Sequence, residues 1–366
     1  MKRSKIDATL AIILALLVVG GALIFASAAF GLLARGSNGM SSVFFSHLVL
    51  GIGVGLVALF LMLNIDVSFW RRHAPYIYLG ALIATALVFL PYLGAEHGGG
   101  RRWIILFGIS MQPSEGLKLA SIIMSAAYFA GIRGKVNSTL YGLGGYMAIM
   151  ALPALLLILQ PDLGTLGVII LSSLAVFWAA GARMRDIALM MLIGIVALAA
   201  LSYARPYVRD RVQTFLDPSR GQLEESYQIR QSLIAIGSGQ MLGRGFGQGV
   251  QKFTYLPEPM GDSIFAVASE ELGFAGASSI IILFTLFALR GYAIAARAVD
   301  PFARYLAVGI STYLACEAFI NIAALLGLAP LTGIPLTFIS QGGTAMLVSL
   351  ASAGVLLAIS RKRAKV

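Results

Sequence analysis

Long apolar segments recur along almost the whole chain and restrict its possible folds more than any other feature. A helix that crosses a bilayer needs about 20 mostly apolar residues, and ten segments of this sequence meet that requirement. Only 12% of the residues are charged, against roughly 25% in soluble domains. We therefore predict an all-α integral membrane protein in which residues 1–366 form one polytopic membrane domain. The predicted spans are 8–33, 43–64, 74–94, 114–132, 142–160, 162–180, 186–204, 263–290, 302–327 and 335–359.

Basic residues are distributed unevenly between the two sides of this predicted bundle. If both termini lie inside, the inner segments hold 16 of the 27 Lys and Arg residues, and the short outer loops hold only Arg35, Arg101 and Arg102. This is the positive-inside bias of membrane proteins. It predicts cytoplasmic termini and a large outer loop, 205–262, between spans seven and eight. It also accounts for the net charge of +11 without a nucleic-acid partner.

Polar residues gather on the predicted outer side. Ionisable groups at membrane depth are costly and normally face a cavity or one another. The sequence therefore predicts one polar site that opens toward the outer leaflet. The segments concerned are EHGGGRRW (96–103), MQPSEGLK (111–118), LQPDLGT (159–165), the loop 205–262 and APLTGIPLTFISQGG (329–343).

Glu115 and Lys118 are three residues apart and share one helix face. In one interpretation, Ser114 caps this helix and the two charges neutralise each other as a structural ion pair. In the other, Lys118 is a cation for an anionic substrate, together with Arg101 and Arg102. In LQPDLGT, Asp162 after Pro161 is interpreted mainly as a helix cap.

The long outer loop leaves two questions open. Its apolar run, Leu233, Ile234 and Ile236, could dip into the membrane without spanning it. The glycine-rich stretch 237–249 either turns tightly over a ligand or is simply a flexible loop.

Four carboxylates lie between residues 251 and 274, just where the eighth span begins. Asp262 suits a helix N-cap, and Glu270, eight residues later, would share its helix face. Such carboxylates suggest proton handling or cation binding, and the structural alternative is an internal salt bridge. Glu258 and Glu271 stay unassigned.

A metal ion, if bound, is expected to be a hard divalent cation such as Mg²⁺ or Mn²⁺ with Asp262 as a ligand. The three histidines show no ligand spacing. In the ninth span, Glu317 and Asn321 are four residues apart, so they either face the same cavity or form a structural hydrogen-bonded pair. Gly342 and Gly343 break the last span, as in helices that line cavities.

These motifs, in this order, resemble the SEDS proteins, the bacterial cell-wall polymerases of shape, elongation, division and sporulation. The resemblance rests on RRWI, QPSE with Lys118, LQPDLGT, YLPEP with Asp262, EELGF and PLTGIPL with its following GG. KFTYLPEP and the C-terminal segment look more like the division branch (FtsW-like) than the elongation branch (RodA-like). Two motifs depart from the family: GDSIFAV stands for the usual TDFIFAV, and SQGGT for SYGGS.

The resemblance implies a peptidoglycan glycosyltransferase of the bacterial cytoplasmic membrane. Such an enzyme joins the disaccharides of lipid II by β-1,4 bonds at the outer leaflet and releases undecaprenyl pyrophosphate. It implies as partners a class B penicillin-binding protein and other divisome or elongasome membrane proteins. The alternatives are a lipid II flippase and a non-catalytic scaffold.

The family's essential aspartate matches Asp262, which we expect to be the catalytic base or a cation ligand. An inverting transfer with a pyrophosphate leaving group needs one carboxylate on the acceptor side. We expect the other site residues to bind substrate or to orient those that do. Predicted to bind substrate are Arg101, Arg102, Lys118, Glu115, Gln160, Asp162, Gln341 and Gly342, and predicted to support them are Glu115 again, Glu270 and Glu317.

Overall fold

The structure is a computed structural model that describes residues 6–34, 43–97, 100–106, 109–217 and 224–361. Eight helices in these ranges are long and apolar enough to cross a membrane. They are α1 (Ala8–Ala34), η1 with α3 (Phe45–Gly53 and Val54–Asn64), α4 with η2 (Val67–Ala86 and Leu87–Phe89), η3 with α6 (Thr139–Gly144 and Gly145–Leu159), α8 (Met184–Ala204), α12 (Ile264–Arg297), α13 (Pro301–Leu325) and α14 (Gly343–Ser360).

Two further helices of the bundle lie outside this set. They are α5 (Pro113–Gly131), which carries Glu115 and Lys118 in its first turns, and α7 (Leu163–Ala179), which is one of the shorter apolar helices. Each of the ten predicted segments therefore contains a helix, and eight of these helices meet the length and hydropathy of a membrane span.

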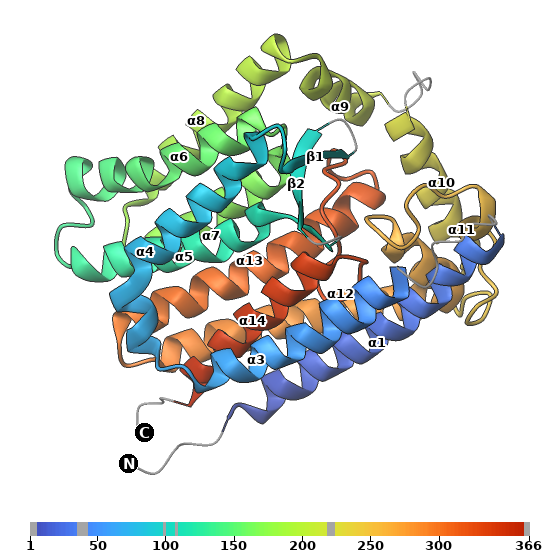
Figure 1. The fold of residues 1–366 in the computed structure, drawn as a ribbon, viewed down its shortest axis with the longest axis horizontal. Helices are drawn as coiled ribbons and strands as arrows, with labels where there is room; N and C mark the ends of the chain where they lie inside the picture. Colours follow the sequence, from blue (N-terminus) through green and yellow to red (C-terminus); the bar gives the residue numbers. More distant parts are fainter. Residues whose placement is uncertain (1–5, 35–42, 98–99, 107–108, 218–223, 362–366) are drawn as a thin grey trace.

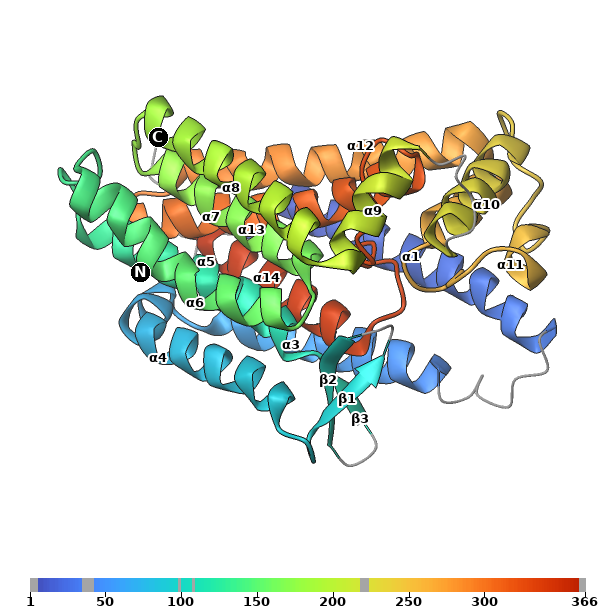
Figure 2. The same ribbon diagram turned by 90° about the horizontal axis from the view of Figure 1, so that it is seen from above.

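The helices run side by side, so the bundle has two distinct ends (Figures 1 and 2). Both chain termini lie at one end, which we call the terminal end. At the opposite, loop end lie α9 (Pro206–Leu216), α10 (Glu224–Ser238) and α11 (Gln251–Thr254). Three helices therefore lie within the described residues of the predicted outer loop 205–262.

The centre of the bundle is α13, which packs against α12, α7, α5 and α14. Small residues allow this close packing, as is usual between membrane helices. A Cβ atom on Gly309 would collide with the side chains of Ile122 and Val176, and one on Gly354 with the backbone of Leu59. The site described below is therefore attached to the most firmly packed helices.

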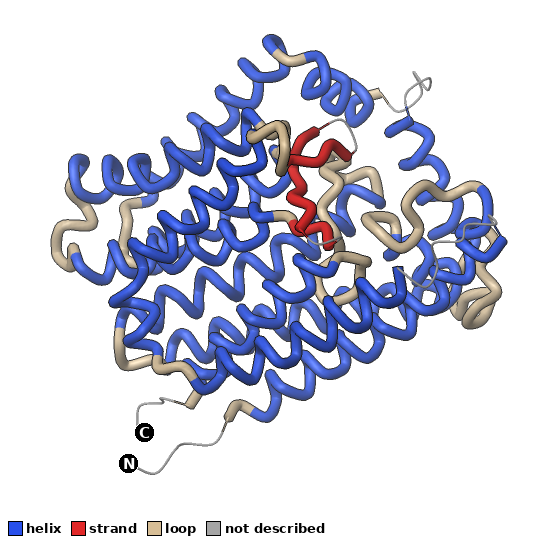
Figure 3. Tube along the Cα trace, in the orientation of Figure 1, coloured by secondary structure: helices blue, strands red, loops and turns tan. Residues whose placement is uncertain are grey.

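A three-stranded antiparallel sheet replaces part of what we predicted as loop (Figure 3). Its strands are β1 (Gly94–His97), β2 (Gly100–Leu106) and β3 (Ile109–Met111), in the order β1-β2-β3. The all-α fold class is confirmed for the membrane domain, and this small sheet is an element that the sequence analysis did not predict. The run Trp103-Ile-Ile-Leu has the aromatic and β-branched residues that favour strands, and pairing satisfies the backbone polar groups of each strand.

Several predicted boundaries are also wrong. Helix α4 begins at Val67 and not at residue 74, because the Asp66 carboxylate accepts a hydrogen bond from Ser68 N (2.9 Å) and caps the helix earlier. Helix α12 continues to Arg297 and is interrupted at Gly273, whose φ of 67° is left-handed. Residues 335–342 are not helical, since α14 begins only at Gly343.

Candidate active site

The polar segments that we predicted to share one face are connected to one another at the loop end of the bundle. Residues 260 and 261, before α12, contact residues 340 and 341, before α14. The first turn of α14 contacts Gln112, the residue before α5, and Gln112 in turn contacts Asp162, the residue before α7. The hydrogen bonds are Gln341 N to Met260 O (2.7 Å), Ser340 Oγ to Gly261 O (2.6 Å), Gln112 N to Thr344 Oγ1 (3.3 Å) and Gln112 Nε2 to Asp162 Oδ2 (3.2 Å).

Asp262 lies at the centre of these contacts, half-buried, two residues before α12. Its Oδ1 accepts a hydrogen bond from Gln228 Nε2 of α10 (2.9 Å) and a longer one from Ser263 Oγ (3.5 Å). Its backbone oxygen accepts a bond from Asn321 Nδ2 (2.7 Å), which also binds Ile334 O (2.8 Å). Gln228 of α10 therefore holds the carboxylate, and Asn321 of α13 holds the backbone of the same residue.

Asp262 is not the helix cap that its position suggested. The N-cap is Ser263, and no side-chain capping bond is formed there. A carboxylate used as a cap would have its oxygens directed at the first helical N–H groups. Here Asp262 is instead held by Gln228 and Asn321. Its carboxylate is not used in helix capping, so it can act as a base.

The environment raises the pKa of the Asp262 carboxyl from 3.8 to about 6. Burial is the largest cause, and the nearby Glu258 carboxylate raises the pKa further, while the hydrogen bond from Gln228 acts in the opposite direction. A base whose pKa lies near the working pH is well matched to proton transfer. Burial away from water and a nearby like charge are the usual ways in which a protein raises the pKa of a carboxyl group.

Lys118 is 1% exposed and forms ion pairs with two carboxylates. Its Nζ lies 2.8 Å from Glu115 Oε2, as the three-residue spacing predicted, and it also donates a hydrogen bond to Glu317 Oε1. Glu317 Oε2 accepts a further bond from Thr337 Oγ1 (3.2 Å). Beside Glu317 lies a cavity of only about 10 Å³, lined otherwise by residues before and within α14, among them Ser340. Such a space is about the size of one water molecule.

The burial of Lys118 changes its interpretation. An ammonium group enclosed by two carboxylates is not presented to a pyrophosphate, so the structure favours the ion-pair interpretation over a cation exposed to substrate. The suggested capping role of Ser114 is wrong, because the N-cap of α5 is Gln112 and no side-chain capping bond is present. Ser114 Oγ instead makes a long hydrogen bond to Asp162 Oδ2 (3.4 Å).

Asp162 is the N-cap of α7, as predicted, and its Oδ1 accepts a bond from Thr165 N (3.2 Å). Gln160 is fully buried, and its Nε2 donates to Thr85 O (2.7 Å). Arg102 Nε donates to Gln160 O (3.2 Å) and so attaches the sheet to the α6–α7 turn. Arg101, on the same strand, is exposed. Of the two arginines, Arg101 is the more accessible to a ligand.

Glu270 does not orient Asp262 by any contact in the structure. Its carboxylate accepts hydrogen bonds from Val250 N (2.9 Å) and Gln251 N (3.2 Å) and lies 3.7 Å from Arg244 Nε. The eight-residue spacing was misleading because α12 begins only at Ile264, after Asp262. Glu270 therefore holds the loop, in agreement with the salt-bridge alternative.

Glu271, whose role the sequence analysis left unassigned, belongs to a buried ion pair. It pairs with the buried Lys252 (2.6 Å) and accepts a bond from Ser27 Oγ of α1 (2.7 Å). Gly243 N and Gly245 N, in the glycine-rich stretch, bind Gly239 O (2.8 Å) and Glu271 O (3.1 Å). The stretch 240–252 is thus packed onto the interruption of α12, which favours an ordered covering loop over a merely flexible one.

Metal binding stays a prediction. No group of three His, Cys, Asp or Glu residues suited to an ion occurs within the described ranges. Mg²⁺ can, however, be held by one or two protein carboxylates together with substrate phosphates. Asp262 is the residue that would hold such an ion, as the sequence analysis expected.

Gln228 and Ser340 were missed in the sequence analysis, although both contact the Asp262 segment. Gln228 lies 34 residues before its partner, in a helix that belongs to no recognisable motif. Ser340 belongs to the FISQGG motif but was not singled out within it. No sequence pattern predicts Gln228, because its role depends on a contact made only in the folded chain.

Comparison with known proteins places the chain in a family. A family model described as "Cell cycle protein" (FtsW/RodA/SpoVE) matches residues 7–365. Stage V sporulation protein E of Bacillus subtilis (strain 168) is 37% identical over 360 residues, 98% of each chain. The chain belongs to the SEDS family. This family is one of peptidoglycan glycosyltransferases, and its members are multi-pass proteins of the bacterial cytoplasmic membrane.

Other SEDS relatives agree in sequence and in fold. A probable peptidoglycan glycosyltransferase FtsW of Geobacter sulfurreducens is 39% identical over 316 residues, which are 86% of this chain and 84% of the relative. A chain from a structure described as "Structural coordination of polymerization and crosslinking by a peptidoglycan synthase complex" matches with TM-score 0.75 and 25% identity, covering 97% of this chain and 98% of that one. The rod shape determining protein RodA of Thermus thermophilus has the same fold (TM-score 0.70, 24% identity, 98% of both chains).

Proposed function

We propose that this protein polymerises lipid II into β-1,4-linked glycan strands at the outer leaflet of the cytoplasmic membrane. The observation that carries the proposal is the half-buried Asp262 with its raised pKa, held by separate parts of the chain where the polar segments meet. Membership of a family of peptidoglycan glycosyltransferases supports the same reaction class. The FtsW-like motifs favour cell division over elongation.

In the proposed reaction, the acceptor 4-hydroxyl oxygen attacks the anomeric carbon of the donor. The bond from that carbon to the phosphate oxygen breaks, and undecaprenyl pyrophosphate leaves with the bonding electrons. Asp262 takes the proton of the acceptor hydroxyl. A single displacement of this kind inverts the anomeric configuration, so that an α-linked donor gives a β-linked product.

Arg101 is the residue we propose to counter the charge of the pyrophosphate, because it is exposed on β2. Preorganised cations at a developing negative charge supply much of the catalytic effect in such sites. Arg102 holds the sheet against the turn before α7. Gln341 N donates to Met260 O, two residues before Asp262, and Gly342 is the N-cap of α14. Where a divalent cation binds, it would supply further charge neutralisation at the same place.

We also propose that α5 and α7 complete a ten-helix membrane domain with both termini in the cytoplasm. The loop end, with residues 205–262, then faces outward, where lipid II is used. A class B penicillin-binding protein would cross-link the product, as the similarity to a chain of a peptidoglycan synthase complex suggests.

The test is incubation of the full-length protein with purified lipid II and its partner penicillin-binding protein. We expect glycan strands that a muramidase digests, resolved by gel electrophoresis. The rival function, a lipid II flippase, is measured in vesicles as transfer of fluorescent lipid II between leaflets. Transfer without any glycan product would reject the polymerase proposal.

The pH dependence of polymerisation follows from the raised pKa of Asp262. A general base acts when deprotonated, and a group with a pKa of about 6 becomes protonated below that pH. We expect kcat/KM to fall about tenfold per pH unit below pH 6 and to be level above it. The measurement is the initial rate between pH 5 and pH 8.

Glu258→Gln provides the matched variant for this profile. It removes the like charge that raises the pKa of Asp262, so the acid limb should move to lower pH while the rate at neutral pH is retained. A profile that is flat from pH 5 upward in both proteins would contradict the role of Asp262 as the base.

A further inference from the structure

A second cavity lies at the terminal end of the bundle, remote from Asp262. It has a volume of about 330 Å³ and lies where the turn after α5 meets the turn after α7 and the first turns of α13. Its lining includes Arg133, Asn137 and Tyr305, together with Gly134 and Gly181. Nothing in the proposed polymerase reaction uses this cavity.

Tyr305 provides the first indication of a ligand. Its side chain is only 8% exposed, yet within the described part of the chain its hydroxyl makes no hydrogen bond. The hydroxyl oxygen is not among the fully enclosed unpaired side-chain atoms of the described residues, so it is open to the cavity that the residue lines. A hydroxyl of this kind, on an otherwise buried side chain, is available to a ligand in that cavity.

Arg133, whose side chain is exposed, provides the second indication. It lines the same cavity and, among the residues that the structure describes, makes neither a hydrogen bond nor an ion pair. The described lining of the cavity contains no acidic residue, and the acidic residues of the segments that follow α7 and precede α13 have arginine partners: Asp186 pairs with Arg185 (3.6 Å) and Asp300 with Arg71 (3.8 Å). The cavity therefore offers hydrogen-bond donors and positive charge without a neutralising carboxylate.

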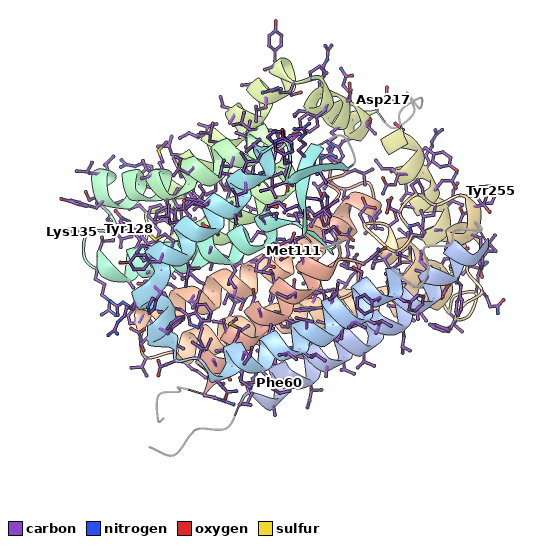
Figure 4. The ribbon with its side chains drawn as sticks, in the orientation of Figure 1. Phe60, Met111, Tyr128, Lys135, Asp217 and Tyr255 are labelled. Atoms are coloured by element: carbon purple, nitrogen blue, oxygen red, sulfur yellow. The ribbon has the colours of Figure 1, made fainter. Side chains whose placement is uncertain are left out.

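The surroundings place this cavity at a membrane surface. Trp178 at the end of α7 and Tyr141 in η3 are exposed nearby, and such aromatic residues are enriched where helices leave the bilayer. Lys135 Nζ lies 5.1 Å from the centre of the Tyr141 ring. In Figure 4, Lys135 and Tyr128 lie at the opposite end of the bundle from Tyr255.

We propose that this cavity binds a phosphate oxyanion, with Arg133 and the Tyr305 hydroxyl as donors and an anionic phospholipid headgroup as its source. Arginine and hydroxyl donors are suited to phosphate oxygens. Basic pockets between helices at the membrane surface hold anionic headgroups in other membrane proteins. The site is independent of the polymerase reaction, so either proposal can fail without the other.

The experiment is native mass spectrometry of the full-length protein in detergent with phosphatidylglycerol. Diacylglycerol, which lacks the phosphate, is the control lipid. We expect Arg133→Gln to weaken retention of phosphatidylglycerol about tenfold and Tyr305→Phe about threefold, since charged hydrogen bonds contribute more than neutral ones. The matched variant is Arg72→Gln, which removes an exposed arginine of α4, and it should retain the lipid like the wild type.

The proposal would be overturned if Arg133→Gln and Arg72→Gln lost the same amount of bound phosphatidylglycerol. It would also be overturned if the wild-type protein retained phosphatidylglycerol and diacylglycerol equally. Thermal unfolding of each variant checks folding, and Tyr305→Phe keeps the test decisive if Arg133→Gln is unstable. A second arm adds inorganic phosphate. Displacement of phosphatidylglycerol at millimolar phosphate supports the oxyanion site but identifies free phosphate as an equally good occupant, and no displacement identifies the lipid.

Discussion

Replacement of Asp262 by asparagine is expected to reduce lipid II polymerisation by roughly 10²- to 10⁴-fold, the usual contribution of a general base. Asparagine has nearly the same shape and can still pair with Gln228, but it cannot take the proton of the acceptor hydroxyl. The measurement is the rate of glycan formation at pH 7.5 with the partner penicillin-binding protein present.

The same substitution should not destabilise the fold. The pKa of Asp262 is raised in the folded protein, so the folded state binds this proton more tightly than the unfolded state. Above pH 6 the ionised carboxylate therefore lowers stability, and asparagine removes that cost. We expect an unchanged or higher melting temperature at pH 7.5. An Asp262→Asn protein that folds normally and polymerises at more than about a tenth of the wild-type rate would refute the assignment.

The membrane helices could be predicted because lipid imposes a strong rule on the chain. Backbone polar groups in a bilayer must be paired within the segment, so long apolar runs such as 302–327 have few alternatives to a helix. The strands β1–β3 are subject to no such rule. Their pairing depends on short runs between glycines, and the weak strand preference of Trp103 and Ile104 was not recognised.

The spacing of residues along single helices predicted part of the site, but it could not predict contacts between residues far apart in the sequence. The Glu115–Lys118 pair follows from helical periodicity, whereas Glu317 is 199 residues from Lys118 in the sequence. The family motif identified Asp262, but its partner Gln228 has no motif. Counting residues from Asp262 to Glu270 failed because the intervening chain is not one continuous helix. Motifs therefore located the site, and only the fold shows which groups touch.

Substitution of Lys118 by methionine is expected to destabilise the protein by about 3–5 kcal/mol, because it leaves two buried carboxylates without a countercharge. Glu115 and Glu317 are 2% and 1% exposed, so water cannot readily replace the ammonium group. The measurement is thermal unfolding in detergent. Lys135→Met, at an exposed lysine outside this cluster, is the matched control and should change stability little.

A triple variant, Lys118→Met with Glu115→Leu and Glu317→Leu, separates structure from catalysis. Replacing a buried ion cluster with hydrophobic groups of similar size is often nearly neutral for stability, so the melting temperature should recover. If Lys118 acts only by holding α5 to α13, polymerisation should recover with it. A triple variant that is stable but inactive would instead show that the charges of this cluster are needed for catalysis, against the structural role that their burial indicates.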